Sequence, residues 1–200
     1  MRLVIATGNA GKLKELRELL PPPAFDVLPQ SQFTAVNVDE TGLSFVENAI
    51  LKARHAAQAS GLPAIADDSG LEVDALDGAP GIYSARYAGV GASDEDNLRK
   101  LLVALEGKTP EQRTARYQCA LVFMRSAVDP SPLICQASWE GRITPDRRGT
   151  GGFGYDPIFE LVERPVTVAE LPAAEKNQLS HRGKALRGLV AQLRELHPIS

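Results

Sequence analysis

The sequence predicts an α/β fold built on a mixed β-sheet that is flanked by helices. Short apolar runs alternate with amphipathic helical stretches over much of the chain, which is typical of strand–helix units. Two long strand-like runs, at 115–125 and 133–143, are separated only by a turn near Asp129 and Pro130, which indicates an antiparallel pair. With 200 residues, 44% of them hydrophobic, the chain can bury one sizeable core, so we expect a single domain over residues 1–200.

The first elements are assigned from apolar spacing and from capping signals. A short apolar strand at 3–6 leads through a turn into a helix at 12–20, which has leucines at 13, 16 and 20 on one face. A second helix opens with a capping box, in which Ser44 is the N-cap and Glu47 lies three residues further on. Gly61 is expected to end this helix.

Two adjacent carboxylates follow the next apolar run. Strand 63–66 leads into Asp67 and Asp68, and Ser69-Gly70 is expected to turn the chain into a further strand at 71–76. The sequence therefore places the acids at a strand end.

The second half of the chain is assigned in the same way. Ser93 is expected to cap a helix that has three acids in its first turn and ends at Gly107. After the two long strands comes a glycine-rich loop at 149–156, the most flexible-looking stretch. A final helix, expected over 182–197, carries apolar residues at 185, 186, 189, 190 and 193.

Charge and hydropathy exclude several partners. Lys and Arg number 22 against 25 Asp and Glu, and the net charge of -3 gives no electrostatic footprint for duplex nucleic acid or for an anionic membrane. No apolar run approaches the roughly 20 residues that a membrane helix needs. Met1 leads into a strand-like run that does not resemble a signal peptide, so we expect a cytoplasmic protein.

Cysteine and histidine usage argues against a zinc site. Cys119 and Cys135 each lie inside an apolar strand-like run and are expected to be reduced core thiols. His55, His181 and His197 share no metal-ligand spacing. A metal in this protein is therefore expected to be a hard cation with oxygen ligands.

The first motif with chemical content joins the first strand to the first helix. It consists of Thr7, Gly8, Asn9, Ala10, Gly11 and Lys12. Glycines let backbone N–H groups converge on an anion, the helix start adds partial positive charge, and the lysine adds a full charge. Only two residues separate the glycines and a leucine follows the lysine, so the motif is not a Walker A loop. A plain strand–helix turn is the alternative.

The acidic pair is the second motif. Adjacent carboxylates beside a sheet core need a cation or several donors, and Mg²⁺ is the natural cation because it takes oxygen ligands. Side chains alternate along a strand, so only one of Asp67 and Asp68 needs to face a substrate. Lys52 lies on the second helix and Glu40 just before it, where both can face the same site. The alternatives are a solvated acidic turn and a solvated helix face.

A third group of residues suits a planar base. The glycine-rich loop carries Phe153, Tyr155 and Asp156, which offer an aromatic face for stacking and a carboxylate for ring N–H groups. Further along the chain, donors for a carbonyl or a phosphate are available from Lys176, His181 and Arg182.

Six segments together strongly resemble the Ham1-like inosine triphosphate pyrophosphatase family, with its bacterial dITP/XTP pyrophosphatases as the nearest match. The segments are TGNAGK at 7–12, ETGLSFVENAILKA at 40–53, ADDSGLEVDAL at 66–76, GAPGIYSARYAG at 78–89, GTGGFGYDPIF at 149–159 and SHRGKAL at 180–186. They cover nearly the whole chain in the family's order. Residues 21–37 and 162–170 are the segments with a weak match.

The resemblance implies an elongated sheet, two lobes with a deep active-site cleft between them, and a homodimer. It also implies roles for individual residues. Residues 7–12 would hold a triphosphate, Glu40 and Asp68 would bind Mg²⁺, and Asp68 would accept a proton. Lys52 and Ser69 would contact phosphates. The base pocket would consist of Phe153, Gly154, Tyr155, Asp156, Lys176, His181 and Arg182.

The expected reaction is hydrolysis of a non-canonical purine nucleoside triphosphate (ITP, dITP or XTP) to the monophosphate and pyrophosphate, by water attack at the α-phosphorus. A phosphatase that forms an aspartyl phosphate is disfavoured because the acids are adjacent and not spaced as D-x-D. A non-catalytic nucleotide-binding or RNA-binding module leaves Asp67 and Asp68 without a use. A related pyrophosphatase that prefers a modified pyrimidine remains the nearest alternative.

Overall fold

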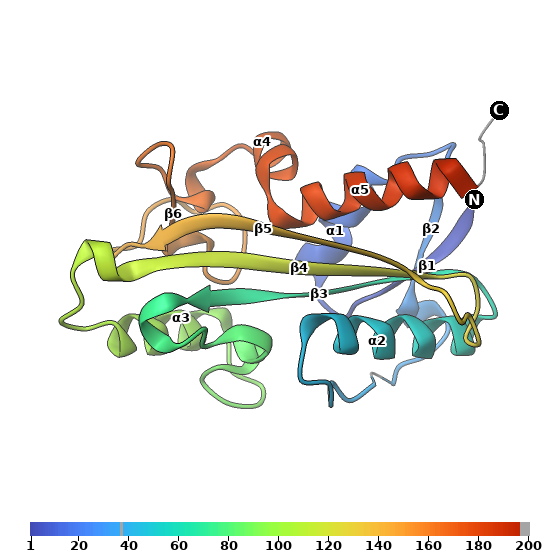
Figure 1. Cartoon of the computed structure of the whole chain (residues 1–200), viewed down its shortest axis with the longest axis horizontal. Coiled ribbons are helices and arrows are strands. Elements are labelled where there is room, and N and C mark those ends of the chain that lie inside the picture. Colours follow the sequence, from blue (N-terminus) through green and yellow to red (C-terminus); the bar gives the residue numbers. More distant parts are fainter. Residues whose placement is uncertain (37, 197–200) are drawn as a thin grey trace. The chain divides into compact units, whose positions relative to one another are not determined.

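A computed structural model describes residues 1–36 and 38–196 of the chain (Figure 1). The strands are β1 (Arg2–Ala6), β2 (Asp26–Pro29), β3 (Ala64–Val73), β4 (Thr114–Met124), β5 (Leu133–Ile143) and β6 (Phe159–Leu161). The helices are α1 (Ala10–Leu19), α2 (Phe45–Ser60), α3 (Asp94–Ala104), α4 (Ala173–Leu179) and α5 (His181–Leu196). His197, to which the last helix was expected to extend, lies outside the described residues.

The six strands form one open sheet in the order β2-β1-β3-β4-β5-β6. Strand β1 pairs in parallel with both β2 and β3, in registers that place Val4 opposite Leu28 and Ala64. Strand β6 pairs antiparallel with β5, with Ile143 opposite Phe159. Both senses of pairing occur, so the expected mixed sheet is confirmed.

Strand β3 differs from the sequence prediction. A turn was expected at Ser69-Gly70, but the strand continues without interruption through 64–73. Asp67 and Asp68 consequently lie in the middle of the strand and are 1% and 5% exposed. The turn was expected from the turn-like pair Ser69-Gly70. Cations from α1, α2 and α5 compensate both carboxylates, so the chain need not turn to solvate them.

Capping chemistry explains where helices α2 and α3 begin. The Ser44 hydroxyl accepts the Glu47 N–H at the start of α2, and Gly61 ends this helix in the left-handed region at φ 67°. At the start of α3, Ser93 and Asp96 form a reciprocal capping box. Both helix starts were predicted, whereas β2, β6 and α4 were not.

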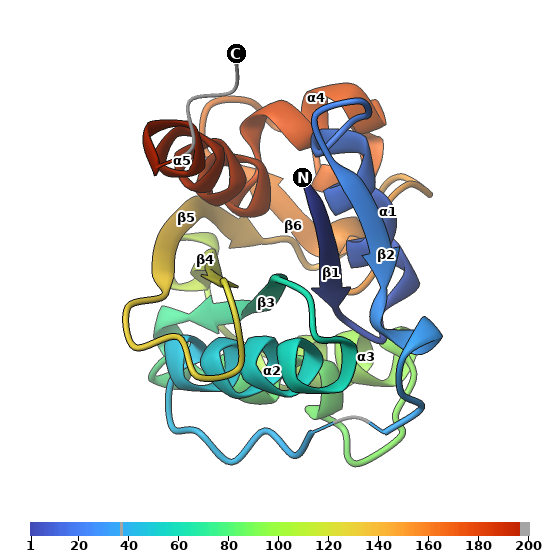
Figure 2. The ribbon, with the colours of Figure 1, turned by 90° about the vertical axis from the view of Figure 1, so that its right-hand side faces the viewer.

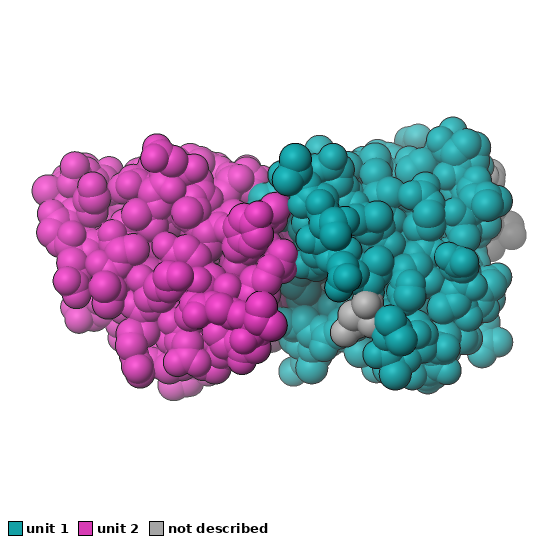
Figure 3. All heavy atoms as spheres, turned by 90° about the horizontal axis from the view of Figure 1, so that it is seen from below, with its two compact units in different colours: residues 1–68, 119–137, 182–200 teal, residues 69–118, 138–181 magenta. Residues whose placement is uncertain are grey.

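Contacts divide the chain into two compact units (Figure 3). Unit 1 contains residues 1–68 and 119–137 and the chain from Arg182, and unit 2 contains 69–118 and 138–181. Strands β3, β4 and β5 each contribute residues to both units.

Unit 1 has apolar residues packed on both faces of its strands. Along β1, Leu3 and Ile5 join a cluster with leucines of α1 and α5, whereas Val4 and Ala6 join a cluster with alanines of α2. Figure 2 shows α1 and α2 on opposite sides of β1. The alternation of β1 thus fixes two helix layers, one on each face.

Unit 2 has its own core. Leu71 of β3 and Leu98 of α3 pack there with the aromatic side chains of Tyr117, Trp139 and Phe159. The Tyr117 and Phe159 rings lie 4.5 Å apart at 37°. No helix among residues 1–36 and 38–196 combines the length and the apolar character that crossing a bilayer requires.

Candidate active site

The predicted anion-binding loop connects β1 to α1. Asn9 is the N-cap of α1, and its Oδ1 accepts the Lys12 N–H at 3.0 Å. The Thr7 hydroxyl in turn accepts the Asn9 N–H at 3.1 Å. These bonds fix the loop, so that the positive end of the α1 dipole and the Lys12 ammonium belong to one short segment. Such a segment can bind a phosphate.

Asp67 lies in a buried network of charges in unit 1. Its Oδ1 is 2.7 Å from the Lys12 Nζ, and its Oδ2 accepts the Arg182 Nε–H at 3.1 Å. Arg182 also pairs with Glu15 of α1. The Cys119 thiol donates to the same Oδ2 at 3.5 Å. Both acids of the network are therefore compensated by cations.

Asp68 faces a different set of partners. The Lys52 Nζ of α2 donates to Asp68 Oδ1 at 2.5 Å and to Glu40 Oε1 at 2.9 Å. Asp67 contacts α1 and α5, and Asp68 contacts α2, as expected for successive residues of a strand. The two acids therefore have different ion-pair partners, while the prediction that only one of them faces a substrate stays a prediction.

The two carboxylates are shifted in opposite directions. Burial raises the pKa of Asp67, but the charges of Arg182, Lys12 and Lys52 outweigh it, and the net pKa is well below the ordinary value. Burial also raises the pKa of Asp68, and here the lysines only partly offset it, so its net pKa is above the ordinary value. Asp67 is thus a permanent anion, and Asp68 is the better proton acceptor.

The Lys52 ammonium is held in its charged form. Burial lowers its pKa, but the carboxylates of Asp68, Asp67 and Glu40 outweigh burial, and the net pKa is raised. A charged ammonium beside the acids can bind an anion that approaches them.

The donor set at Asp68 and Glu40 fits a hard divalent cation. Both residues offer carboxylate oxygens, and both contact the same Lys52 Nζ. Asp68 Oδ2 is buried and has no hydrogen-bond partner among residues 1–36 and 38–196. A buried carboxylate oxygen with spare lone pairs is suited to a metal ligand. No cluster of three or more acidic, histidine or cysteine side chains suited to a metal occurs within the described chain.

The predicted base-binding loop is held by its own aspartate. In unit 2, Asp156 Oδ2 accepts the Phe153 N–H at 2.9 Å and the Lys176 Nζ–H at 2.7 Å. The Lys176 ammonium lies 4.5 Å from the centre of the Phe153 ring. A Cβ on Gly152, whose φ is 74°, would lie 2.0 Å from Asp156 Oδ2, so only glycine fits there. The loop thus closes tightly around one carboxylate.

A further hydrogen bond ties the same loop to the start of α3. Asp94, at the start of α3, accepts the Gly154 N–H at 2.7 Å. The Tyr155 hydroxyl donates to the Ser84 carbonyl at 2.9 Å and is buried. A pocket of about 420 Å³ lies beside the loop and is lined by Asp94, Glu95, Leu98, Arg147, Gly149, Thr150, Gly151, Gly152, Phe153, Gly154 and Pro157.

The structure brings several of the predicted site residues together within each unit. Phe153, Asp156 and Lys176 contact one another in unit 2, and the His181 ring stacks on Tyr117 in the same unit. Arg182, whose place in the base pocket stays a prediction, binds acids of unit 1 through its Nε and Nη1. Ser69 directly follows Asp68 on β3 and is half-buried.

Sequence reasoning missed three residues that hold the site together. Glu15 lies three residues after Lys12 on α1, a spacing that brings side chains to one helix face and could have indicated it. Asp94 was recognised only as a helix-start acid. Tyr117 lies inside the predicted strand at 115–125 and belongs to no motif, and only the fold reveals its bond to Asp156.

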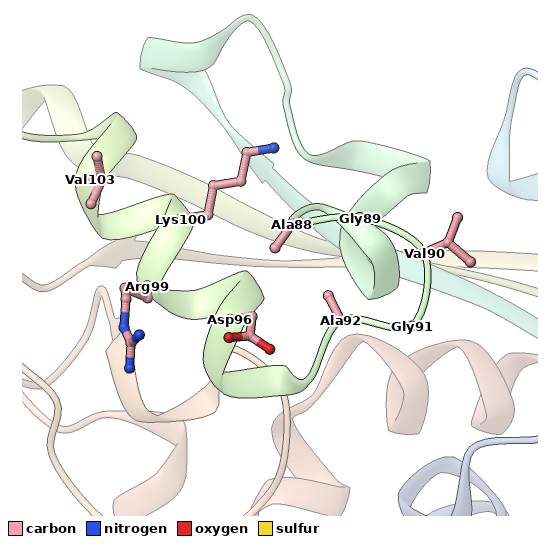
Figure 4. A pocket seen from close by; sticks show the side chains of 9 residues that line it. All are labelled: Ala88, Gly89, Val90, Gly91, Ala92, Asp96, Arg99, Lys100 and Val103. Atoms are coloured by element: carbon pink, nitrogen blue, oxygen red, sulfur yellow. The ribbon is translucent and has the colours of Figure 1, made fainter.

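A larger hollow lies elsewhere in unit 2, between the 88–92 loop and α3 (Figure 4). Its volume is about 540 Å³, and none of its lining residues belongs to the predicted site. The Lys100 ammonium already donates to the Tyr87 carbonyl at 2.6 Å, and Arg99 pairs with Glu95. Each of these two basic groups thus has a partner within the fold.

Comparison with known proteins identifies the class to which this fold and site belong. The HAM1 protein from Coxiella burnetii has a solved structure that matches with a TM-score of 0.89 and 48% identity, over 98% of this chain and 99% of that one. The Ham1 family model matches residues 3–192, and the chain belongs to the Ham1 family.

Curated relatives carry a more specific name. A dITP/XTP pyrophosphatase from Thioalkalivibrio sulfidiphilus (strain HL-EbGR7) is 62% identical over 96% of this chain and 98% of its own length. Another from Vibrio parahaemolyticus serotype O3:K6 (strain RIMD 2210633) is 60% identical over 96% of both chains. The family resemblance seen in the motifs is thereby confirmed.

Proposed function

We propose that this chain is a pyrophosphatase that hydrolyses non-canonical purine nucleoside triphosphates, such as dITP, ITP and XTP, to the monophosphate and pyrophosphate. Relatives that are 60% and 62% identical over nearly the full chain are named dITP/XTP pyrophosphatases, which supports the reaction and the substrate class. The whole chain, with both units, would act as one domain.

The observation that carries the proposal is that the two acids of β3 have different ion-pair partners and opposite pKa shifts. Asp68 is buried with a raised pKa, contacts Lys52, and keeps an oxygen without a hydrogen-bond partner among the described residues. Asp67 is compensated by Lys12 and Arg182 and stays ionised. A proton acceptor beside a lysine, next to an anion-binding loop, suits hydrolysis of a phosphoanhydride.

The roles of the residues follow from this geometry. The loop at 7–12 and Lys12 would hold the triphosphate, and Lys52 and Ser69 would contact phosphates near the attacked phosphorus. Asp68 would accept the proton of the attacking water, and Lys52 would offset negative charge that develops on the departing pyrophosphate.

A cation fits the same acids. Glu40 and Asp68 would hold Mg²⁺, which when bound withdraws charge from phosphate oxygens and lowers the pKa of a bound water. Until it binds, Lys52 balances both carboxylates. The proposal also includes a homodimer and a cytoplasmic location, and it includes neither nucleic acid nor a membrane as a partner.

Base selectivity would depend on the loop at 149–156 and on Lys176, His181 and Arg182. Hypoxanthine and xanthine present an O6 acceptor that these donors can meet, whereas adenine presents an amino donor there. Two donors that face each other in a buried site cost about 1–3 kcal/mol, and more where one is charged. Adenine nucleotides should therefore be poor substrates.

Product analysis tests the reaction. With ITP and Mg²⁺, we expect IMP and pyrophosphate in equal amounts, and release of IDP with orthophosphate would contradict attack at the α-phosphorus. A rate survey over ITP, XTP, dITP, GTP, ATP and modified pyrimidine triphosphates tests the base preference. A clear preference for a pyrimidine would replace the purine proposal with the related pyrophosphatase.

The Asp68→Asn variant tests the proton acceptor. Loss of a general base lowers turnover by roughly 100- to 10,000-fold, while the loop at 7–12 should still bind nucleotide. Nucleotide affinity, measured by calorimetry with the same protein, separates lost chemistry from lost binding. Unchanged turnover would remove Asp68 from this role.

A further inference from the structure

Tyr117 of β4 contacts two residues of the proposed base pocket. Its hydroxyl donates to Asp156 Oδ1 at 3.1 Å. Its ring is stacked on the His181 imidazole, with centroids 4.8 Å apart and planes at 11°. The side chain is itself buried and packs against Phe159 of β6.

Both oxygens of the carboxylate that Tyr117 contacts accept hydrogen bonds from groups of the protein. Asp156 is 3% exposed, and Oδ2 already accepts from the Phe153 N–H and the Lys176 ammonium. With Oδ1 bonded to Tyr117, this carboxylate acts as an anchor for its neighbours. It therefore fixes the positions of the Phe153 backbone N–H and of the Lys176 ammonium.

The anchor determines the two groups that a base would meet. The Lys176 Nζ lies 4.5 Å from the Phe153 ring centre, so the ammonium and the aromatic ring lie side by side in a cation–π contact. If Asp156 rotated away, both groups would lose their bonds at the same time. The Tyr117 hydroxyl opposes that rotation because it binds the other carboxylate oxygen.

We propose that Tyr117 is a positioning residue for base selection, which fixes Asp156 through its hydroxyl and His181 through its ring. The inference rests on the proposed function, because it assumes that these residues form a base pocket. Tyr117 would contact no substrate atom and would act only through its two neighbours. Its loss should therefore change discrimination between bases more than the rate of the chemical step.

Kinetics of the full-length Tyr117→Phe variant test the hydroxyl. Removal of one hydrogen bond to a charged group should lower kcat/KM for ITP by roughly three- to tenfold, mainly through KM. The rate with ATP should change much less, since adenine has no O6 for Lys176 to meet, and the ITP to ATP ratio should fall. An unchanged ratio, or an equal loss with both nucleotides, would overturn the proposal.

A matched control removes a buried hydroxyl of unit 2 at another place. Thr144 is buried, and its hydroxyl donates to the Asp146 carbonyl at 2.7 Å. The Thr144→Val variant should lose stability to a similar extent and keep the wild-type ITP to ATP ratio. If this control lowers the ratio as much as Tyr117→Phe does, the effect is one of general destabilisation and the positioning role is refuted.

NMR of the nucleotide-free protein separates this proposal from the proposed function. In Tyr117→Phe, the Phe153 amide and the Lys176 side-chain resonances should shift, and the His181 ring protons should keep the ring-current shift of the stack. In Tyr117→Leu, that ring-current shift should disappear as well. Wild-type Phe153 and Lys176 resonances in Tyr117→Phe would overturn the positioning role. Failure of the wild-type protein to release pyrophosphate from ITP would instead overturn the proposed function.

Discussion

Asp67 provides the sharpest test of how this chain tolerates charge in its interior. The Asp67→Asn substitution preserves the shape of the side chain and removes one negative charge that faces Lys12 and Arg182. Its side chain is 0% exposed and that of Arg182 is 3% exposed, so water cannot replace the lost carboxylate. Arg182 would keep its ion pair with Glu15 and lose the one with Asp67.

The size of the effect follows from this burial. Breaking a buried ion pair by removing one partner costs about 3–5 kcal/mol of unfolding free energy. For a chain of this size each kcal/mol lowers Tm by about 2–4 °C, so Tm should fall by roughly 6–20 °C. Thermal unfolding followed by circular dichroism measures the shift, and urea unfolding gives the free energy directly.

Two further variants show whether the uncompensated cation causes the loss. Asp77→Asn is the matched control, because Asp77 is exposed and lies at φ 51°, a conformation that asparagine also accepts. It should change stability by less than about 0.5 kcal/mol. In the double variant Asp67→Asn, Arg182→Met the loss should be smaller than the sum of the single losses. A Tm for Asp67→Asn within 2 °C of the wild type, or simple additivity, would refute the reasoning.

Three other predictions follow from single contacts. Hydrogen bonds from Arg125 lower the pKa of Asp129 well below its ordinary value, so this group stabilises the fold fully above its ordinary pKa and loses the effect only as pH falls through the lowered pKa. Asp129→Asn should therefore cost about 1–3 kcal/mol in urea unfolding at pH 7 and the same at pH 5, and a cost that has already disappeared at pH 5 would contradict the lowered pKa. Gly42→Ala would place a Cβ 2.7 Å from Asn48 Oδ1, which should disturb the segment that carries Glu40, a proposed cation ligand. Mn²⁺ binding, followed by electron paramagnetic resonance, should therefore weaken, and unaltered binding would argue against a link between Gly42 and the cation site. Burial raises the pKa of the Cys119 thiol, so a thiol reagent should label it only after unfolding, and fast labelling of the folded protein would contradict its burial.

Local signals in the sequence predicted much of the fold. The starts of α2 and α3 follow from Ser44 and Ser93, because a capping residue and its partner lie within one helical turn. Strand β2 was missed because it is a four-residue parallel edge strand after three prolines. Strand β6 has only three residues, too few for an alternation to be recognised.

The expected turn in β3 shows why the rest could not be predicted. Asp-Asp-Ser-Gly is a turn-like string when its neighbours in sequence are considered alone. The groups that let Asp67 stay buried are Lys12 and Arg182, and the second of these lies 115 residues away in the chain. Spacing alone likewise cannot reveal that Tyr117 reaches Asp156, 39 residues further on. Compensation of buried charge is a property of the fold.

The division of the chain into interleaved segments has a consequence for its synthesis. Chains emerge from the ribosome N-terminus first, and unit 1 contains residues 1–68 but also needs the part of α5 from Arg182 onward. The loop at 7–12 and Asp67 are therefore made long before Arg182, which helps to compensate Asp67. In a nascent or truncated chain that lacks α5, Asp67 has no Arg182 to compensate its charge. Neither unit is a continuous stretch of sequence, so neither corresponds to a single fragment that could be expressed alone.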